Sequence, residues 1–285
     1  MPENLHTLKL GLSFNTLITR DVLPENLNTL EFGGFYDNLI LPNVLPHNLH
    51  TLKLAERFEG NEFLVPLSLP RDLHTLEFGY YNNFPLLPQI LPSKLHTLIF
   101  GQKFNQPINA DVLPEALHTL IFGGEFNQPI AVGILPAKLK YLNLGSSFNQ
   151  PIEEEVLPSE LHTLRFGYDF NQPIKEGVLP KNLEILRFGY EFAQPLLPEV
   201  LPHKLHTLII SHKYNIVYPF PIGIDVIIET DDFEDYEYEA KKIDSLDPVD
   251  IEMLNTYDIE DLYEHNSEIR GGEDEDEDEE WEDFN

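Results

Sequence analysis

The chain has 285 residues, 42% of them apolar, and its 18 Lys and Arg are outnumbered by 49 Asp and Glu, which leaves a formal net charge of −31. Nucleic-acid phosphates and anionic membrane surfaces repel so negative a chain, and we expect it to bind neither. It contains no cysteine, which excludes a disulfide framework, thiolate metal sites and a cysteine nucleophile.

The N-terminal segment, Met1 to His6, has neither the basic region nor the apolar stretch of a signal peptide. No run of about 18 apolar residues occurs, so no membrane-spanning helix is predicted. We therefore expect an intracellular, cytoplasmic location.

A repeat of 22 residues organises most of the chain, and a Leu-Pro step marks each unit. One interval, between Pro46 and Pro70, has 24 residues, with the insertion around Glu59 to Glu62. Met1-Pro2 stands in the same phase, so ten units cover residues 1–218. The steps are Leu23-Pro24, Leu45-Pro46, Leu69-Pro70, Leu91-Pro92, Leu113-Pro114, Leu135-Pro136, Leu157-Pro158, Leu179-Pro180 and Leu201-Pro202.

Each unit reads P-x-x-L-H-T-L-x-F-G-x-x-F-N-Q-P-I, as the unit beginning at Pro92 shows. Two prolines per unit forbid a long helix, because each removes an amide donor and clashes with the preceding turn. Between them, side chains from Thr97 to Phe100 alternate with period two and Gly101 ends the run, which predicts a short strand. Such a strand cannot stand alone, so we expect the units to stack about 4.8 Å apart into a parallel sheet.

The Phe-Asn-Gln-Pro-Ile motif behind Leu-His-Thr-Leu-x-Phe-Gly resembles the signature of the FNIP repeat family, a relative of the leucine-rich repeats. The resemblance implies a right-handed coil. The predicted fold class is therefore a β-rich solenoid, a right-handed leucine-rich-repeat-like stack of ten 22-residue coils with short parallel strands, followed by an acidic tail. The motif stands at 104–108, 126–130, 148–152 and 170–174.

Two columns of fixed residues have a structural interpretation. A recurring asparagine is expected to satisfy backbone groups where the coil turns. The phenylalanine before it is expected to pack into a spine. The asparagines are Asn15, Asn83, Asn105, Asn127, Asn149, Asn171 and Asn215, and the phenylalanines are Phe14, Phe58, Phe104, Phe126, Phe148, Phe170 and Phe192.

A histidine follows the first leucine in seven units. We interpret this column as a solvent-facing row that forms hydrogen bonds at the strand junction, with a pH-sensing or a metal-binding row as alternatives. Lys140 occupies the same site in one unit, and a metal shell would not readily accept it, so we predict no metal or cofactor site. The histidines are His6, His50, His74, His96, His118, His162 and His206.

One outward strand position varies among the fixed ones, and such variation is typical of a surface where a partner is recognised. Ile99 and Ile121 are expected to lie side by side and exposed there, with Arg165 and Arg187 two coils further on. A mixed apolar and cationic stripe suits a partner segment with acidic and apolar residues. The alternatives are a solvated face or a surface that the acidic tail covers. The predicted protein-binding residues are Ile99, Ile121, Arg165 and Arg187, with His96, His118 and His162 beside them.

The charge concentrates after the repeats, since residues 225–285 contain 27 acidic and 3 basic residues. We predict a solenoid over 1–218, a cap with a short helix over 219–270 and a disordered acidic tail over 271–285. Ile224 to Thr230 suits a last strand or cap, and Pro248 to Glu264 an imperfect amphipathic helix. The acidic run at 273–280 either solubilises the protein, docks basic proteins or loosely captures divalent cations.

The chain contains no phosphate-binding loop, nucleophile elbow or zinc-protease motif. Repeat symmetry also works against a pocket where unlike groups converge, so we do not expect an enzyme. The predicted function is a non-enzymatic scaffold for protein–protein interaction through its strand face. The alternatives are a substrate adaptor in ubiquitin transfer, by family analogy, and an acidic-tail chaperone for basic proteins.

Overall fold

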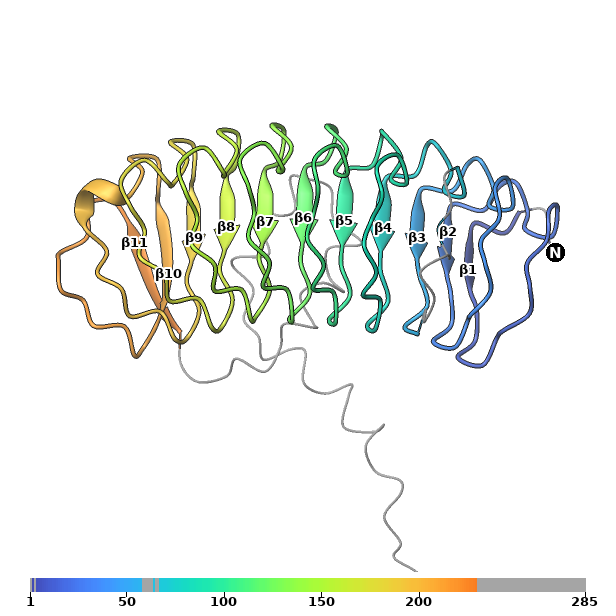
Figure 1. Cartoon of the computed structure of the whole chain (residues 1–285), viewed down its shortest axis with the longest axis horizontal. Coiled ribbons are helices and arrows are strands. Elements are labelled where there is room, and N and C mark those ends of the chain that lie inside the picture. The colour runs from blue at the N-terminus through green and yellow to red at the C-terminus, as the bar shows by residue number, and fades with distance from the viewer. Residues whose placement is uncertain (1, 3, 58–63, 65–66, 230–285) are drawn as a thin grey trace, which may run out of the picture. The chain divides into compact units, whose positions relative to one another are not determined.

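The computed structural model describes residue 2 and residues 4–57, 64 and 67–229. These residues form a stack of coils, each contributing one strand to an 11-stranded sheet in which every neighbouring pair is parallel and strand order follows the chain (Figure 1). The strands are β1 Thr7–Lys9, β2 Thr29–Glu31, β3 Thr51–Lys53, β4 Thr75–Glu77, β5 Thr97–Ile99, β6 Thr119–Ile121, β7 Tyr141–Asn143, β8 Thr163–Arg165, β9 Ile185–Arg187, β10 Thr207–Ser211 and β11 Asp225–Glu229.

The predicted solenoid of short parallel strands is confirmed. The one helical element in the described residues is the single 3₁₀ turn η1, Pro198–Val200. No helix in these residues is both long and apolar enough to cross a membrane.

Every strand is short because the repeat brackets it with turns. The Leu95 amide donates to the Pro92 carbonyl at 3.1 Å, so the proline, with its pre-set φ, opens a turn just before β5. After the strand, the Phe104 amide closes a second turn onto the Gly101 carbonyl at 3.0 Å. Thr97 and Ile99 then pair with Thr119 and Ile121 of the next coil. Identical positions therefore stand in columns across the sheet.

The core fills the inside of the stack. The invariant leucines are buried in every coil after the first, Leu95 and Leu98 fully, whereas those of the first coil are partly buried. The phenylalanine spine is confirmed among the described residues, because Phe104, Phe126 and Phe148 stack with ring centroids 6.1 and 6.0 Å apart. The coils thus share one continuous apolar interior, as the repeated apolar sites predicted.

The glycine that ends most strands lets adjacent coils approach closely. A Cβ placed on Gly101 would lie 1.8 Å from the Gly79 carbonyl oxygen, and one on Gly123 would lie 1.9 Å from the Gly101 oxygen. No side chain fits at such distances. The column of glycines sets the packing of coil upon coil, in addition to ending each strand.

The asparagine column forms a hydrogen-bond ladder between coils, as predicted. The Asn105 Oδ1 accepts the Asn127 amide N–H at 3.0 Å and the Gln128 Nε2 at 3.0 Å. Asn127 and Asn149 repeat the same pair of contacts with the coils that follow them. Each asparagine therefore satisfies the turn of the next coil.

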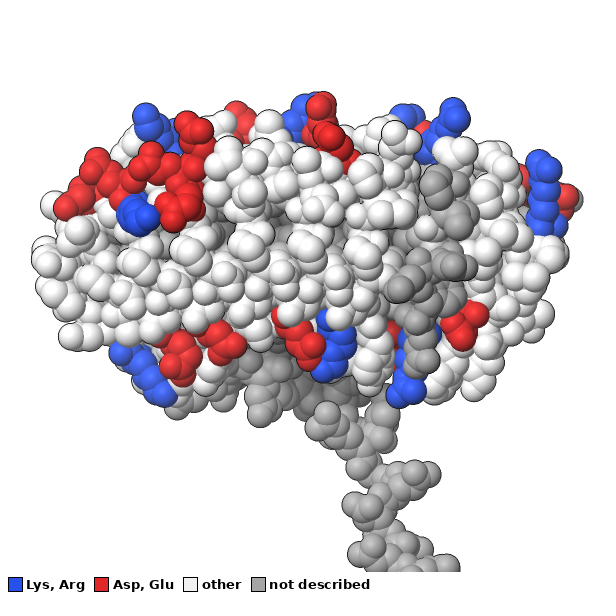
Figure 2. Space-filling model, in the orientation of Figure 1, with Lys and Arg blue, Asp and Glu red and all other residues white. Residues whose placement is uncertain are grey.

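Charged residues avoid the fixed positions of the repeat. Figure 2 shows a face of the molecule on which acidic and basic side chains gather along the two rims and leave an uncharged band between them. The band runs along the stack because the fixed positions are apolar, Asn, Gln, Pro or Gly, whereas charges occur at variable positions.

The C-terminal part of the described chain extends the sheet. β11 pairs in parallel with β10 and lies within the segment predicted as a last strand or cap. The predicted helix at 248–264, the acidic run at 273–280 and the insertion at 59–62 lie outside the described residues.

Candidate protein-binding groove

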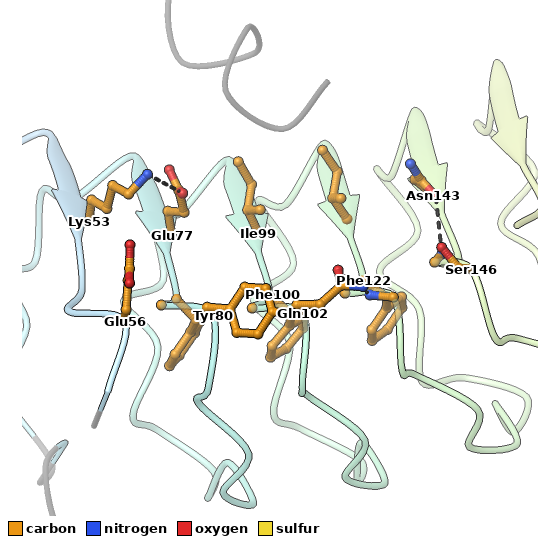
Figure 3. A pocket seen from close by; sticks show the side chains of 17 residues that line it. Lys53, Glu56, Glu77, Tyr80, Ile99, Phe100, Gln102, Phe122, Asn143 and Ser146 are labelled. Carbon is orange, nitrogen blue, oxygen red and sulfur yellow. Dashed lines mark hydrogen bonds and ion pairs between the residues drawn. The ribbon is translucent and has the colours of Figure 1, made fainter. Parts of the chain in front are cut away.

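A groove runs across the carboxyl ends of the central strands and encloses about 160 Å³ (Figure 3). Two rows of side chains border it, and the glycine backbone lies between them. The first row, here called the outer column, consists of the second outward residue of each strand. The second, here called the turn column, consists of the residue after each coil's glycine position. In the groove, the outer column supplies Lys53, Glu77, Ile99, Ile121 and Asn143, and the turn column supplies Glu56, Tyr80, Gln102, Gly124 and Ser146.

The groove is lined differently along its length. Tyr80 and Gln102 border its central part, whereas the small residues Gly124 and Ser146 border the β6–β7 end (Figure 3). Gln102 is held in place, because its Oε1 accepts the Gly124 amide at 3.0 Å. Gly124 therefore leaves room for the Gln102 amide, since a Cβ at 124 would lie 1.9 Å from Gln102 Nε2, and its own amide anchors that side chain.

Ile99 and Ile121 lie side by side, as predicted, but they are not exposed. Their exposed fractions are 2% and 6%. They stand between the outer-column residues of the flanking strands, and both line the groove. The expectation of an exposed apolar pair is therefore wrong; the pair is an inner surface of the groove.

Arg165 and Arg187 continue the outer column beyond the groove and are paired in register. Arg165 is only 8% exposed, and its Nη1 donates to the Tyr141 hydroxyl at 3.4 Å. Arg187 contacts the Glu229 carboxylate through Nε at 3.1 Å and Nη2 at 2.9 Å. The chain's own last described strand thus shows that a carboxylate can bind to Arg187.

The β3–β4 end of the groove is charged and incompletely satisfied. Lys53 Nζ lies 2.6 Å from Glu77 Oε1. Among the described residues, the buried Glu77 Oε2 has no hydrogen-bond partner. At the opposite end, the Asn143 Oδ1 accepts the Gly145 amide at 3.1 Å. The groove therefore has a hydrogen-bond acceptor, the Glu77 Oε2, at one end and the apolar Ile99 and Ile121 at its centre.

The histidine column lies at the other end of the strands, and the groove lining does not include His96, His118 or His162. The rings of His50, His74, His96 and His118 follow one another with centroids 5.0, 5.0 and 5.2 Å apart. Lys140 separates His162 from this row in the repeat.

The environment of His96 and His118 disfavours their protonated form. Burial lowers the pKa of His96, and the neighbouring His118 and His74 lower it further. Burial also lowers the pKa of His118; Lys140 adds to the effect, and a hydrogen bond to the Ala116 backbone opposes it. Within the part of the chain that is described, no group of three or more His, Asp or Glu is placed to hold a metal ion.

The sequence analysis missed the turn column and Tyr141. Tyr80, Gln102 and Ser146 line the groove, and Tyr141 replaces threonine at the first outward position to contact Arg165. A signal was present, since the residue after the glycine varies as freely as the outer column does. Only the folded coil shows that the two variable columns face each other.

The chain matches the model of the FNIP repeat over residues 1–35, 14–57, 61–103, 81–125, 104–147, 126–169 and 170–213. No curated protein matches it. Among solved structures, it is similar to CroV588, described as a novel circular leucine-rich-repeat protein, with 31% identity and a TM-score of 0.59 over 81% of this chain and 44% of that chain. The match to the pneumococcal vaccine antigen PcpA has 16% identity and a TM-score of 0.24, covering 79% of this chain and 68% of that chain.

The chain spans less than half the length of CroV588. Solenoids of this kind are typical protein-interaction scaffolds, because stacking creates a long surface with repeated positions. Since the repeat model covers most of the sequence and a leucine-rich-repeat protein shares the coil, this chain belongs to the FNIP repeat family.

Proposed function

We propose that this protein is a non-enzymatic scaffold that binds a segment of another protein along its strand face, at the groove and the adjoining arginines. The single observation that carries the proposal is the groove itself, where the apolar Ile99 and Ile121 lie between a charged pair on one side and Asn143 on the other.

The size of the groove supports a protein segment rather than a small molecule. Its volume of about 160 Å³ is well below the ~300–1,000 Å³ of small-molecule pockets. A shallow trough of this kind accommodates individual side chains of a longer partner. Arg165 and Arg187 extend the same column and would favour acidic residues in that partner.

The other two hypotheses have less support. The chaperone hypothesis depends on the acidic run, which lies outside the described residues. The ubiquitin-adaptor hypothesis rests on family analogy alone. Both remain predictions.

The test reverses the charge of the two arginines in the tagged full-length chain, as Arg165→Glu with Arg187→Glu, followed by crosslinking and mass spectrometry of the captured complexes. We expect at least one partner of the wild-type chain to be lost. The matched control is Arg20→Glu with Arg71→Glu, which makes the same change in charge at two exposed residues outside the groove lining.

Circular dichroism must show that both variants keep the β-sheet spectrum, because Arg187 also binds Glu229. A set of partners unchanged by the strand-face variant, or lost equally in the control, would contradict the proposal.

A further inference from the structure

The two ends of the groove differ chemically, because Glu77 at one end has a carboxylate oxygen without a hydrogen-bond partner among the described residues. Glu77 is 9% exposed, and its Oε1 is paired with Lys53, while its Oε2 has no hydrogen-bond partner among the described residues. A buried carboxylate oxygen without a hydrogen-bond donor is destabilising, because it has lost its contacts with water and gained none in their place. Since Glu77 lines the groove, a ligand that entered could supply the donor.

The outer column then fixes where each type of partner residue fits. It reads Glu77, Ile99, Ile121, Asn143 and Arg165 on consecutive strands β4 to β8. Strands are about 4.8 Å apart, so Glu77 and Arg165 are separated by about 19 Å along the stack. An extended peptide advances about 3.3 Å per residue, so six residues cover this distance.

Because alternate side chains of an extended peptide point the same way, its first, third, fifth and seventh residues would face the outer column. The third residue falls about 6.6 Å from the first, between Ile99 and Ile121. The fifth falls near Asn143 and the seventh near Arg165. Each position of the peptide is thereby matched to an apolar, polar or cationic neighbour.

We propose that the groove binds an extended segment that runs along the stack, with a lysine or arginine at Glu77, an aliphatic residue two positions on, and an acidic residue six positions on at Arg165. This rests on the proposed protein-binding function and names the chemistry of the partner. The basic residue would donate to the Glu77 Oε2, and the carboxylate would approach Arg165, beside the Arg187–Glu229 ion pair.

The test uses the full-length chain and labelled seven-residue peptides with blocked termini, followed by fluorescence anisotropy. The matched peptide has lysine first, isoleucine third, asparagine fifth and glutamate last, with serine elsewhere. A charge-swapped peptide keeps the composition but exchanges lysine and glutamate. If its lysine met Glu77, its isoleucine would fall at Asn143, so we expect it to bind about tenfold more weakly.

Glu77→Gln, which keeps the shape of the side chain, should weaken the matched peptide about tenfold, the loss expected for a charge-assisted hydrogen bond. That loss should disappear for a peptide with glutamine in place of lysine. Glu115→Gln is the control, since Glu115 is exposed and does not line the groove.

Equal affinity for the matched and charge-swapped peptides, or no measurable binding of either, would overturn the inference. So would a Glu77→Gln effect that does not depend on the peptide's lysine. The peptide comparison uses the wild-type chain, so it stands even if the variant folds poorly. A partner that needs Arg165 and Arg187 but ignores Glu77 would leave the proposed function in place and remove this inference.

Discussion

At the scale of the residue, the repeat places like side chains so close that each one sets the environment of the next. Gly123 shows this for packing, because a Cβ there would collide with the carbonyl of the preceding coil. His96 shows it for charge, because its ring lies 5.0 and 5.2 Å from the His74 and His118 rings. A column of identical residues therefore has properties that no single member would have.

The histidine column predicts a stability that depends on pH. The folded state lowers the pKa of His96 and His118, while an unfolded histidine keeps a pKa of about 6.5. As pH falls through about 6.5, these two histidines therefore bind more protons in the unfolded chain than in the folded chain. Their contribution to the free energy of unfolding then declines until pH reaches the lower pKa values of the folded state. Above about pH 7.5 it should be constant.

Urea unfolding at several pH values between about 5 and 8 checks this expectation. His118→Gln should show a shallower decline below about pH 6.5 than the wild-type chain. His47→Gln, at an exposed histidine outside the column, serves as the control and should keep the wild-type slope. An unchanged slope in His118→Gln would mean that the column has no part in the acid response.

At the scale of the element, each turn depends on its neighbour more than on its own sequence. The asparagine ladder joins successive turns from Asn83 onward, and its last asparagine, Asn171, accepts the Ala193 amide and the Gln194 side chain. Tyr214, in the phenylalanine column, bonds the same turn: its hydroxyl accepts the Leu196 amide and donates to the Gln194 carbonyl. A second feature that recurs every 22 residues is a positive φ. It occurs at Asp111, Gly133, Glu155 and Gly177, with values of 61, 80, 64 and 85°. Only glycine adopts it without strain, so the mixed residue types concealed it in the sequence.

Removing one asparagine of the ladder should lower the free energy of unfolding. Asn127→Ala deletes the oxygen that accepts both the Asn149 amide and the Gln150 side chain, leaving two donors without their partner. We expect the free energy of unfolding to fall by about 1–3 kcal/mol, measured by denaturant titration. Asn109→Ala, at an exposed asparagine outside the column, should change it by less than about 0.5 kcal/mol. Equal effects would show that the ladder contributes little.

At the scale of the whole molecule, stability is a sum over coils and the contacts between neighbours, so position along the stack matters. The central strand β6 is buried at all three residues, whereas the outward residues of β1 are exposed. Leu120 is fully buried between two coils, and Leu8 is only partly buried in the first. The same repeat position therefore has a different energetic weight at the centre and at the end.

Leu120→Ala should lower the free energy of unfolding by about 2–5 kcal/mol, because it leaves a cavity that neighbouring coils cannot close. Leu8→Ala should cost less, since the terminal coil can open locally. Amide hydrogen exchange would show the difference, with faster exchange through the central coils in the first variant and only near the N-terminus in the second. Matching costs at both positions would argue against additive coils.

Much of the fold could be read directly from the repeat. Proline steps, alternating apolar residues and the Phe-Asn columns determined the coil length, the strand position, the parallel stack and the structural role of Asn127, because a strict period leaves one way to bury the same face in every unit. The strand-face candidates Ile99 and Ile121 also followed from the variable column within the invariant pattern. Their burial did not.

Only the tertiary structure decided what those residues face. Residues 22 positions apart become neighbours across the sheet. The groove is lined by the outer column and also by the turn column, which was not predicted from the sequence. Its lining includes the isoleucines but not the histidines. Likewise, only the folded chain shows that Lys53 pairs with Oε1 of Glu77 and that Oε2 has no hydrogen-bond partner among the described residues. A one-dimensional period specifies which residues align, but the distances and exposures between columns arise only when the coils close upon one another.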